Sequence, residues 1–184
     1  IKRNIVFSND ESRKLFLHWV DSFDLDTLIS EINILIKANA KSTNDTLKYI
    51  NEPLRLEFIT ALMLQKQFKN VLVKPNYSFD DEGVPTSFAQ GGTPDIECLD
   101  ENGDVLFEVT LLTGVTQNIR EMPAICRHLQ ERKEKQKNSF SVMIAPYIHN
   151  DTLKYAQFAK FKDDLDIVTI DIPTFSQTIK GKEN

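Results

Sequence analysis

The chain has 184 residues, of which 41% are hydrophobic and 27% charged, and its formal net charge is −5. This composition is typical of an ordinary globular protein with room for one domain. No apolar run approaches the ~20 residues that cross a bilayer, and no signal peptide is expected. Because phosphate contacts dominate affinity for nucleic acids, a chain with this charge is poorly suited to hold DNA alone. Cys98 and Cys126 lack metal-ligand spacing, which predicts reduced thiols in a cytoplasmic protein.

Residues 1–50 are predicted to form a helical lobe. Apolar side chains recur at helical spacing over Asp10–Phe23 and again over Leu25–Ala40, where Asp24 is a suitable cap. A third, short helix is expected over Asn44–Ile50. Since these segments carry no recognisable chemistry, we expect the lobe to pack on the core or on a partner.

A longer helix is predicted from Asn51 through Phe68, because Pro53 suits its first turn. Glu57 lies on the apolar face of this helix. An acid in such a position is costly to bury unless it is paired or binds a cation. The alternative is that Glu57 lies at the edge of the apolar face and reaches water.

After a short strand at Val71–Phe79, the stretch Gly91–Gly114 predicts a hairpin with a two-residue turn at Asn102-Gly103. In this register three pairs of side chains share one face: Asp95 with Thr110, Glu97 with Glu108, and Leu99 with Leu106. The opposite face is apolar. Carboxylates gathered on one face resist burial unless a cation neutralises them, and an oxygen-rich site suits Mg²⁺. The alternative is a solvated polar face on an ordinary hairpin.

A helix is predicted over Gln117–Asn138, with Pro123 near its start. It carries six basic and three acidic side chains. Such a helix is either a solvated face or a surface for DNA phosphates. His128, within this helix, lacks metal-ligand spacing, as do His18 and His149, so all three histidines are predicted to be structural or exposed.

The last part of the chain predicts a strand at Phe140–Ala145, a helix at Asp151–Phe161 and a strand at Ile167–Ile172. Residues 177–184 are expected to form a polar, frayed tail. The order of strands and helices after the N-terminal lobe is that of an α/β protein, with a central mixed sheet and helices on both faces.

Two separated motifs within the hairpin carry a family resemblance. Pro94-Asp95 is followed, after twelve residues, by Glu108-Val109-Thr110. This pattern resembles the PD-(D/E)XK nuclease motif, and the longer strings Val84–Glu97 and Leu106–Gly114 resemble the cleavage domains of AlwI-type type IIS restriction endonucleases. The resemblance runs from about Asn51 to the end of the chain. It implies a restriction-endonuclease-like core at 51–176 within a single nuclease domain over 1–184.

The resemblance also implies a metal site and a reaction. Asp95 and Glu108 would hold Mg²⁺, for which Mn²⁺ would substitute, together with the backbone carbonyl of Val109. Glu57 would complete the metal site, and Glu121 would be an outer member of the acidic cluster. The reaction would be hydrolysis of one strand of duplex DNA, leaving 5′-phosphate and 3′-hydroxyl ends.

The chain departs from the motif at Thr110, where lysine is usual. A threonine hydroxyl lacks the positive charge of lysine, but it would orient the attacking water by hydrogen bonding. The missing charge would then come from a second metal ion or from a more distant cation, with Arg120 and Lys133 as candidates.

Sequence recognition is expected to come from another protein. The chain shows no zinc-finger ligand set and no helix-turn-helix pattern. The resemblance points to bacterial heterodimers, in which a larger subunit recognises the site and nicks one strand. Two alternatives remain: a self-sufficient repair or recombination nuclease on the same core, and a non-catalytic DNA or protein interaction module with a degenerate site.

Overall fold

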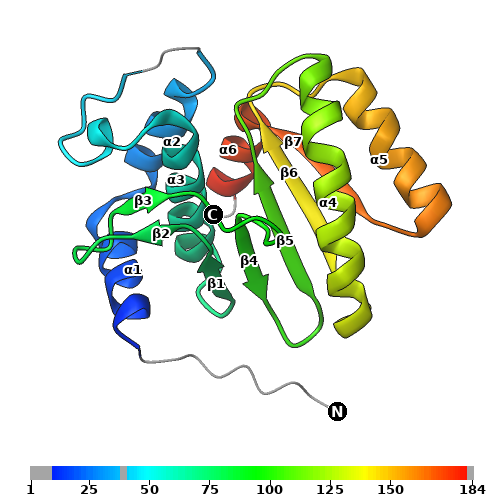
Figure 1. The fold of residues 1–184 in the computed structure, drawn as a ribbon. Coiled ribbons are helices and arrows are strands. Elements are labelled where there is room, and N and C mark those ends of the chain that lie inside the picture. The colour runs from blue at the N-terminus through cyan, green and yellow to red at the C-terminus, as the bar shows by residue number, and fades with distance from the viewer. Residues whose placement is uncertain (1–9, 38–40, 182–184) are drawn as a thin grey trace.

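The computed structural model describes residues 10–37 and 41–181. Its centre is a five-stranded sheet with helices on both faces (Figure 1). In spatial order the strands are β1 (Leu72–Pro75), β4 (Ile96–Leu99), β5 (Asp104–Val109), β6 (Phe140–Ala145) and β7 (Ile167–Asp171). The pairs β1–β4 and β4–β5 are antiparallel, whereas β5–β6 and β6–β7 are parallel. The mixed α/β sheet predicted from the sequence is therefore confirmed.

The single strand expected at Val71–Phe79 is divided in the structure. β1 ends at Pro75, and the chain then enters a separate two-stranded ribbon, made of β2 (Ser78–Phe79) and β3 (Pro85–Ser87). The division occurs at Asn76, whose N–H donates to the carbonyl of Asp95 just before β4 begins. The segment between the two strands therefore lies against the start of β4.

The N-terminal helices are α1 (Glu11–Ser22) and α2 (Leu25–Ile34). Asp24 caps α2 as predicted, through a hydrogen bond from Thr27 N–H. The helix ends before Ala40, because the N–H groups after Ile34 bond to carbonyls three residues earlier, which tightens the last turn. The end of that predicted helix, at 38–40, lies outside the described residues. The helix expected at Asn44–Ile50 is a 3₁₀ turn, η1 (Leu47–Tyr49).

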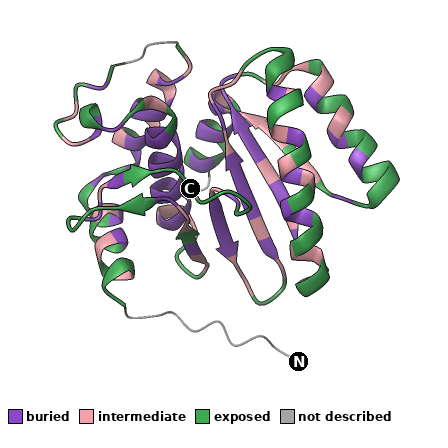
Figure 2. Cartoon of the chain, in the orientation of Figure 1, coloured by how far each residue is buried: buried purple, intermediate pink, exposed green. Residues whose placement is uncertain are grey.

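The helix α3 (Glu52–Gln67) begins as the sequence predicts. The Asn51 side chain accepts a hydrogen bond from Leu54 N–H, and Pro53 lies in the first turn. Every residue from Leu54 to Gln65 is buried, and the visible turns of α3 are mostly purple in Figure 2. A helix buried all round lies in the interior rather than at the surface. The possibility that Glu57 reaches water from the edge of an apolar face is therefore wrong.

The β4–β5 hairpin has a longer loop than the sequence predicts. Leu99 pairs with Asp104 and Glu97 with Leu106, so four residues form the connection. Gly103 does not supply the positive φ that a two-residue turn requires. Instead, a Cβ at Gly103 would lie 2.6 Å from the carbonyl oxygen of Asn138, so glycine is needed for close approach.

Three further helices complete the fold: α4 (Val115–Lys135), α5 (Asn150–Asp163) and α6 (Ile172–Lys180). Pro123 lies inside α4 rather than near its start, and its side chain is exposed. The expected polar tail from residue 177 is also wrong up to Lys180, because Phe175 and Ile179 anchor α6 in the core. Residues 182–184 lie outside the described part.

The helices divide between the two faces of the sheet. α4 and α5 pack on one face, whereas α3 and α6 pack on the other, with α1 and α2 outside α3 (Figure 1). The larger apolar core lies on the α3 side, and two smaller clusters lie under α4 and α5. Among the described helices, none has both the length and the apolar character needed to cross a membrane.

Candidate functional site

Glu57 enters the site from α3, the buried central helix. Its side chain is 4% exposed, and its Oε2 atom is buried without a hydrogen-bond partner among the described residues. Burial, and secondarily the charge of Glu108, raise the pKa of Glu57 to about 8. A carboxylate in this position is unfavourable unless a proton or a cation neutralises it.

Asp95 lies directly before β4, opposite the end of β5. Its Oδ2 atom accepts a hydrogen bond from the backbone N–H of Val109 at 2.8 Å. Burial raises the pKa of Asp95 well above its ordinary value, and the charges of Glu108 and Glu57 raise it further. The hydrogen bond from Val109 acts in the opposite direction, but the carboxyl remains in surroundings that disfavour its charge.

Glu108 is buried near the end of β5, and it contacts a histidine that the sequence did not single out. His128 Nδ1 lies 2.7 Å from Glu108 Oε1, and both side chains are buried. With Glu108 ionised, this nitrogen donates the hydrogen bond. Of the two predicted possibilities, structural or exposed, the exposed one is wrong for His128, because its side chain is buried against Glu108. The available signal was its position seven residues after Glu121, on the same face of one helix.

Thr110 and Glu121 contact each other at the edge of this group. The Thr110 hydroxyl donates to Glu121 Oε1 at 2.9 Å and accepts from Leu112 N–H at 3.1 Å. Burial raises the pKa of Glu121, whereas the hydrogen bond from Thr110 lowers it. The charge of Glu108 also raises this pKa, so Glu121 lies within electrostatic reach of Glu108.

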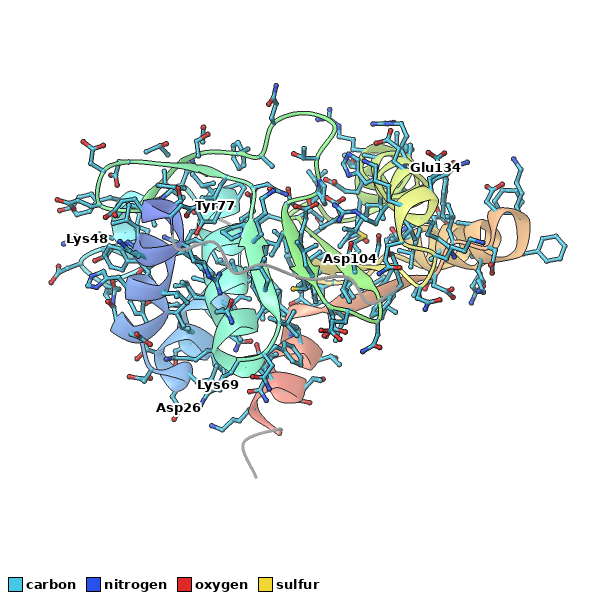
Figure 3. All side chains as sticks on the ribbon, turned by 90° about the horizontal axis from the view of Figure 1, so that it is seen from below. Asp26, Lys48, Lys69, Tyr77, Asp104 and Glu134 are labelled. Carbon is cyan, nitrogen blue, oxygen red and sulfur yellow. The ribbon has the colours of Figure 1, made fainter. Side chains whose placement is uncertain are left out.

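Glu97 does not join these acids, although it was predicted to share their face beside Glu108. It forms an ion pair with Arg132 of α4, and its other oxygen lies 3.2 Å from Lys74 Nζ. Arg132 also donates to Asp104, which is fully buried on β5 and labelled in Figure 3. Glu97 thus belongs to a separate ionic network under α4.

The longer loop explains this separation. The predicted pairing placed Glu97 opposite Glu108, but a shift of two residues pairs Glu97 with Leu106. Side chains alternate with a period of two, so the shift leaves each residue on its predicted face. The shift changes only which residues are paired across the hairpin. As a result, Asp95 rather than Glu97 lies opposite Glu108.

The two cations proposed to replace the motif lysine differ in position. Arg120 is exposed, and its charge lowers the pKa of Glu121, which places it within electrostatic reach of the cluster. Lys133 instead donates to the carbonyl of Asp164 at 2.6 Å. Lys133 is therefore committed elsewhere, and Arg120 is the better candidate.

We call Glu57, Asp95, Glu108 and Glu121 the acidic cluster. Within residues 10–37 and 41–181, no group of three or more His, Cys, Asp or Glu side chains has a geometry ready to hold a metal ion. The chemistry of the cluster nevertheless fits a hard cation, because its donors are carboxylate oxygens and one of them is buried without a partner. Neutralising these charges would also remove their mutual repulsion.

Comparisons with known proteins agree with this architecture. The sequence matches the model of the AlwI restriction endonuclease family over residues 13–177. The fold is similar to the small subunit of the heterodimeric restriction endonuclease R.BspD6I, with a TM-score of 0.72 and 22% identity over 85% of this chain and 77% of that one.

The restriction endonuclease FokI shares the fold more distantly. Its structure gives a TM-score of 0.57 at 9% identity, and FokI bound to DNA gives 0.56. Each match covers 96% of this chain but 31% of FokI. A comparison with curated protein sequences found no significant match.

Proposed function

This chain belongs to the AlwI restriction endonuclease family, and we propose that it is a type IIS, Mg²⁺-dependent subunit that hydrolyses one strand of duplex DNA. One observation carries the catalytic part of this proposal. The acidic cluster gathers carboxylates from α3, the residue before β4, β5 and α4 in surroundings that raise the pKa values of Glu57, Asp95 and Glu121. Perturbed acids gathered in one place are typical of functional sites.

Asp95 and Glu108 would hold the cation, with Glu57 and the carbonyl of Val109 completing its ligands. When bound, Mg²⁺ would supply positive charge next to the scissile phosphate and lower the pKa of a water molecule. The Val109 N–H orients the Asp95 carboxylate, and His128 orients Glu108. These contacts would orient both ligands, one directly before β4 and one on β5, before DNA binds.

The remaining polar groups would support the nucleophile. The Thr110 hydroxyl can donate one hydrogen bond and accept two. It donates to Glu121 and accepts one hydrogen bond from Leu112 N–H. The remaining acceptor position can accept a hydrogen bond from the attacking water. Arg120 would contribute the positive charge that lysine provides in the related motif.

Recognition of the DNA sequence is assigned to a partner. The chain carries a net charge of −5, and phosphate contacts dominate DNA affinity. R.BspD6I, whose small subunit has a similar fold, is described as heterodimeric. We therefore propose a larger subunit that recognises the site and cuts the other strand.

The metal site can be tested on the purified chain with Asp95→Asn and Glu108→Gln. Each substitution keeps the side-chain shape but removes a charge, so Mn²⁺ uptake measured by calorimetry should be lost. Mg²⁺-dependent cleavage with the partner present should fall at least about a thousandfold, since several kcal/mol of transition-state stabilisation is lost. Circular dichroism should show an unchanged fold. Parental cleavage by folded Asp95→Asn protein would contradict the assignment.

A further inference from the structure

Asn76 holds the backbone at both residues of Pro94-Asp95. Its N–H donates to Asp95 O at 2.9 Å, and its side-chain Nδ2 donates to Pro94 O at 2.9 Å. Successive carbonyls of an extended chain point in opposite directions, so one backbone N–H cannot bond to both. The side-chain amide of Asn76 supplies the second donor.

The segment before Asp95 is a turn in which both the N–H and the hydroxyl of Thr93 donate to the carbonyl of Gln90, so its hydrogen bonds stay within the turn. A Cβ at Gly91 or Gly92 would meet no atom within 4 Å, and Gly92 has a φ of +89°. Pro94 has no N–H and cannot donate a hydrogen bond to a neighbouring strand. Asn76 therefore fixes the backbone of Asp95 from one side, while Val109 N–H binds its carboxylate from the other.

The next residue connects the same segment to α3. The ring of Tyr77 packs edge-on against Phe58, with centroids 5.9 Å apart, and Phe58 directly follows Glu57. Tyr77 is 5% exposed and lies beside α3 in Figure 3. The dipeptide Asn76-Tyr77 thus links the backbone that carries Asp95 to the helix that carries Glu57.

We propose that Asn76 is a positioning residue, which fixes the Asp95 carboxylate relative to Glu57 and Glu108 and thereby sets the affinity of the acidic cluster for a divalent cation. This inference rests on the proposed function. Once ionised, the acids repel one another unless a cation lies between them, and this repulsion would push Asp95 away from the others. Two hydrogen bonds from Asn76 oppose that displacement.

The test is calorimetric titration of the full chain with Mn²⁺ alone, well below the melting temperature of each variant. Asn76→Ala removes the side-chain donor, and Asn76→Asp keeps its shape but places a carboxylate next to Pro94 O. Both should bind Mn²⁺ about tenfold more weakly or worse, as is usual when a partner of a metal ligand is removed. The matched control is Asn138→Ala, whose amide donates to Asn102 O in the hairpin loop.

The outcomes separate this inference from the proposed function. Parental Mn²⁺ affinity in folded Asn76 variants would overturn the role of Asn76 while leaving the metal site in place. An equal loss of affinity in Asn138→Ala would also overturn it, because any weakened loop would then suffice. If the unsubstituted chain takes up no Mn²⁺ through Asp95, the proposed metal site fails and the role of Asn76 fails with it. If Asn76→Ala does not fold, Asn76→Asp alone decides the test. Asn76→Asp should fold, because it keeps the side-chain shape and the position is only half-buried.

Discussion

At the scale of single residues, the acidic cluster lowers the stability of the folded chain. Glu57 is buried with an unpartnered oxygen, and among the described residues the Asp95 carboxylate accepts a hydrogen bond only from Val109 N–H. Both carboxyls have raised pKa values because burial and their neighbours disfavour their charge. The folded chain therefore stores unfavourable energy that a bound cation would relieve.

The first prediction is that the metal-free chain loses stability as pH rises. The pKa of Glu57 is raised from 4.5 to about 8, so the folded state retains a proton that the unfolded state releases in this interval. The free energy of unfolding should therefore fall from pH 4.5 to about pH 8 and then level off. Urea denaturation with a chelator present would measure this.

Glu57→Gln is the control for that titration, because it should reduce the slope over the same interval. Carboxyls with lowered pKa values, such as Asp24, lose their contribution to the free energy of unfolding only at pH values below this window. Saturating Mn²⁺ should also reduce the slope, since a cation favours the ionised acids. An equally steep slope in Glu57→Gln would show that Glu57 is not responsible.

The second prediction concerns the hydroxyl of Thr110. Thr110→Val keeps the shape but removes the donor to Glu121 and leaves Leu112 N–H without its acceptor. Cleavage should fall about tenfold, and the free energy of unfolding should fall by about 1–2 kcal/mol. Initial cleavage rates and urea denaturation would measure the two effects. The control is Thr113→Val at an exposed position, and a Thr110→Val enzyme as fast as the parent would make Thr110 a packing residue.

At the scale of secondary-structure elements, the sequence predicts the faces of the hairpin better than its register. Period-two alternation places Asp95 and Glu108 on one face whether the loop has two residues or four. The structure instead has a four-residue loop, in which Gly103 lies against the carbonyl of Asn138, a residue far along the chain. The Asn102-Gly103 pair predicts a two-residue turn, because the contact with Asn138 cannot be inferred from the local sequence.

The members of the candidate site differ in whether the sequence alone could identify them. Glu57, Asp95, Glu108 and Glu121 could be chosen from their spacing and the family resemblance. The contact of His128 with Glu108 depends on how α4 crosses the sheet, which local periodicity does not determine. Pro123 was expected near the start of this helix, but α4 begins at Val115 and Pro123 lies inside it.

The third prediction tests how α4 is held on the sheet. Arg132 pairs with Glu97 and Asp104, and Asp104 is fully buried. Arg132→Ala should lower the free energy of unfolding by about 3–5 kcal/mol, because the fully buried Asp104 loses the guanidinium that pairs with it, whereas Glu97 keeps Lys74. Urea denaturation would measure the loss. Arg127→Ala, at an exposed position of the same helix, should change stability by about 0.5 kcal/mol or less. Equal effects of the two substitutions would contradict a structural role for the network.

At the scale of the whole molecule, charge is distributed unfavourably for a nuclease that works alone. The chain has 27 acidic and 22 basic side chains, and several acids gather where the scissile phosphate would lie. Arg120 and Arg127 are exposed on α4, but Arg132 and Lys133 of the same helix are engaged with the chain's own acids or carbonyls. The positive charge that α4 offers to DNA phosphates is therefore smaller than its sequence indicates.

The last prediction is that the purified chain cleaves DNA poorly, and cuts one strand when a larger partner is present. A single acidic cluster hydrolyses one phosphodiester, so a double-strand break requires a second site or a repositioned duplex. A net charge of −5 opposes binding to phosphates at physiological salt, so we expect a partner to supply most of the affinity. A Mg²⁺ cleavage assay, with each strand end-labelled in turn and with or without the candidate large subunit, would measure both effects. The Asp95→Asn chain with the same partner is the control, and it should leave only the partner's nick. Efficient, site-specific cleavage of both strands by the purified chain would refute the subunit proposal and make the chain a self-sufficient nuclease.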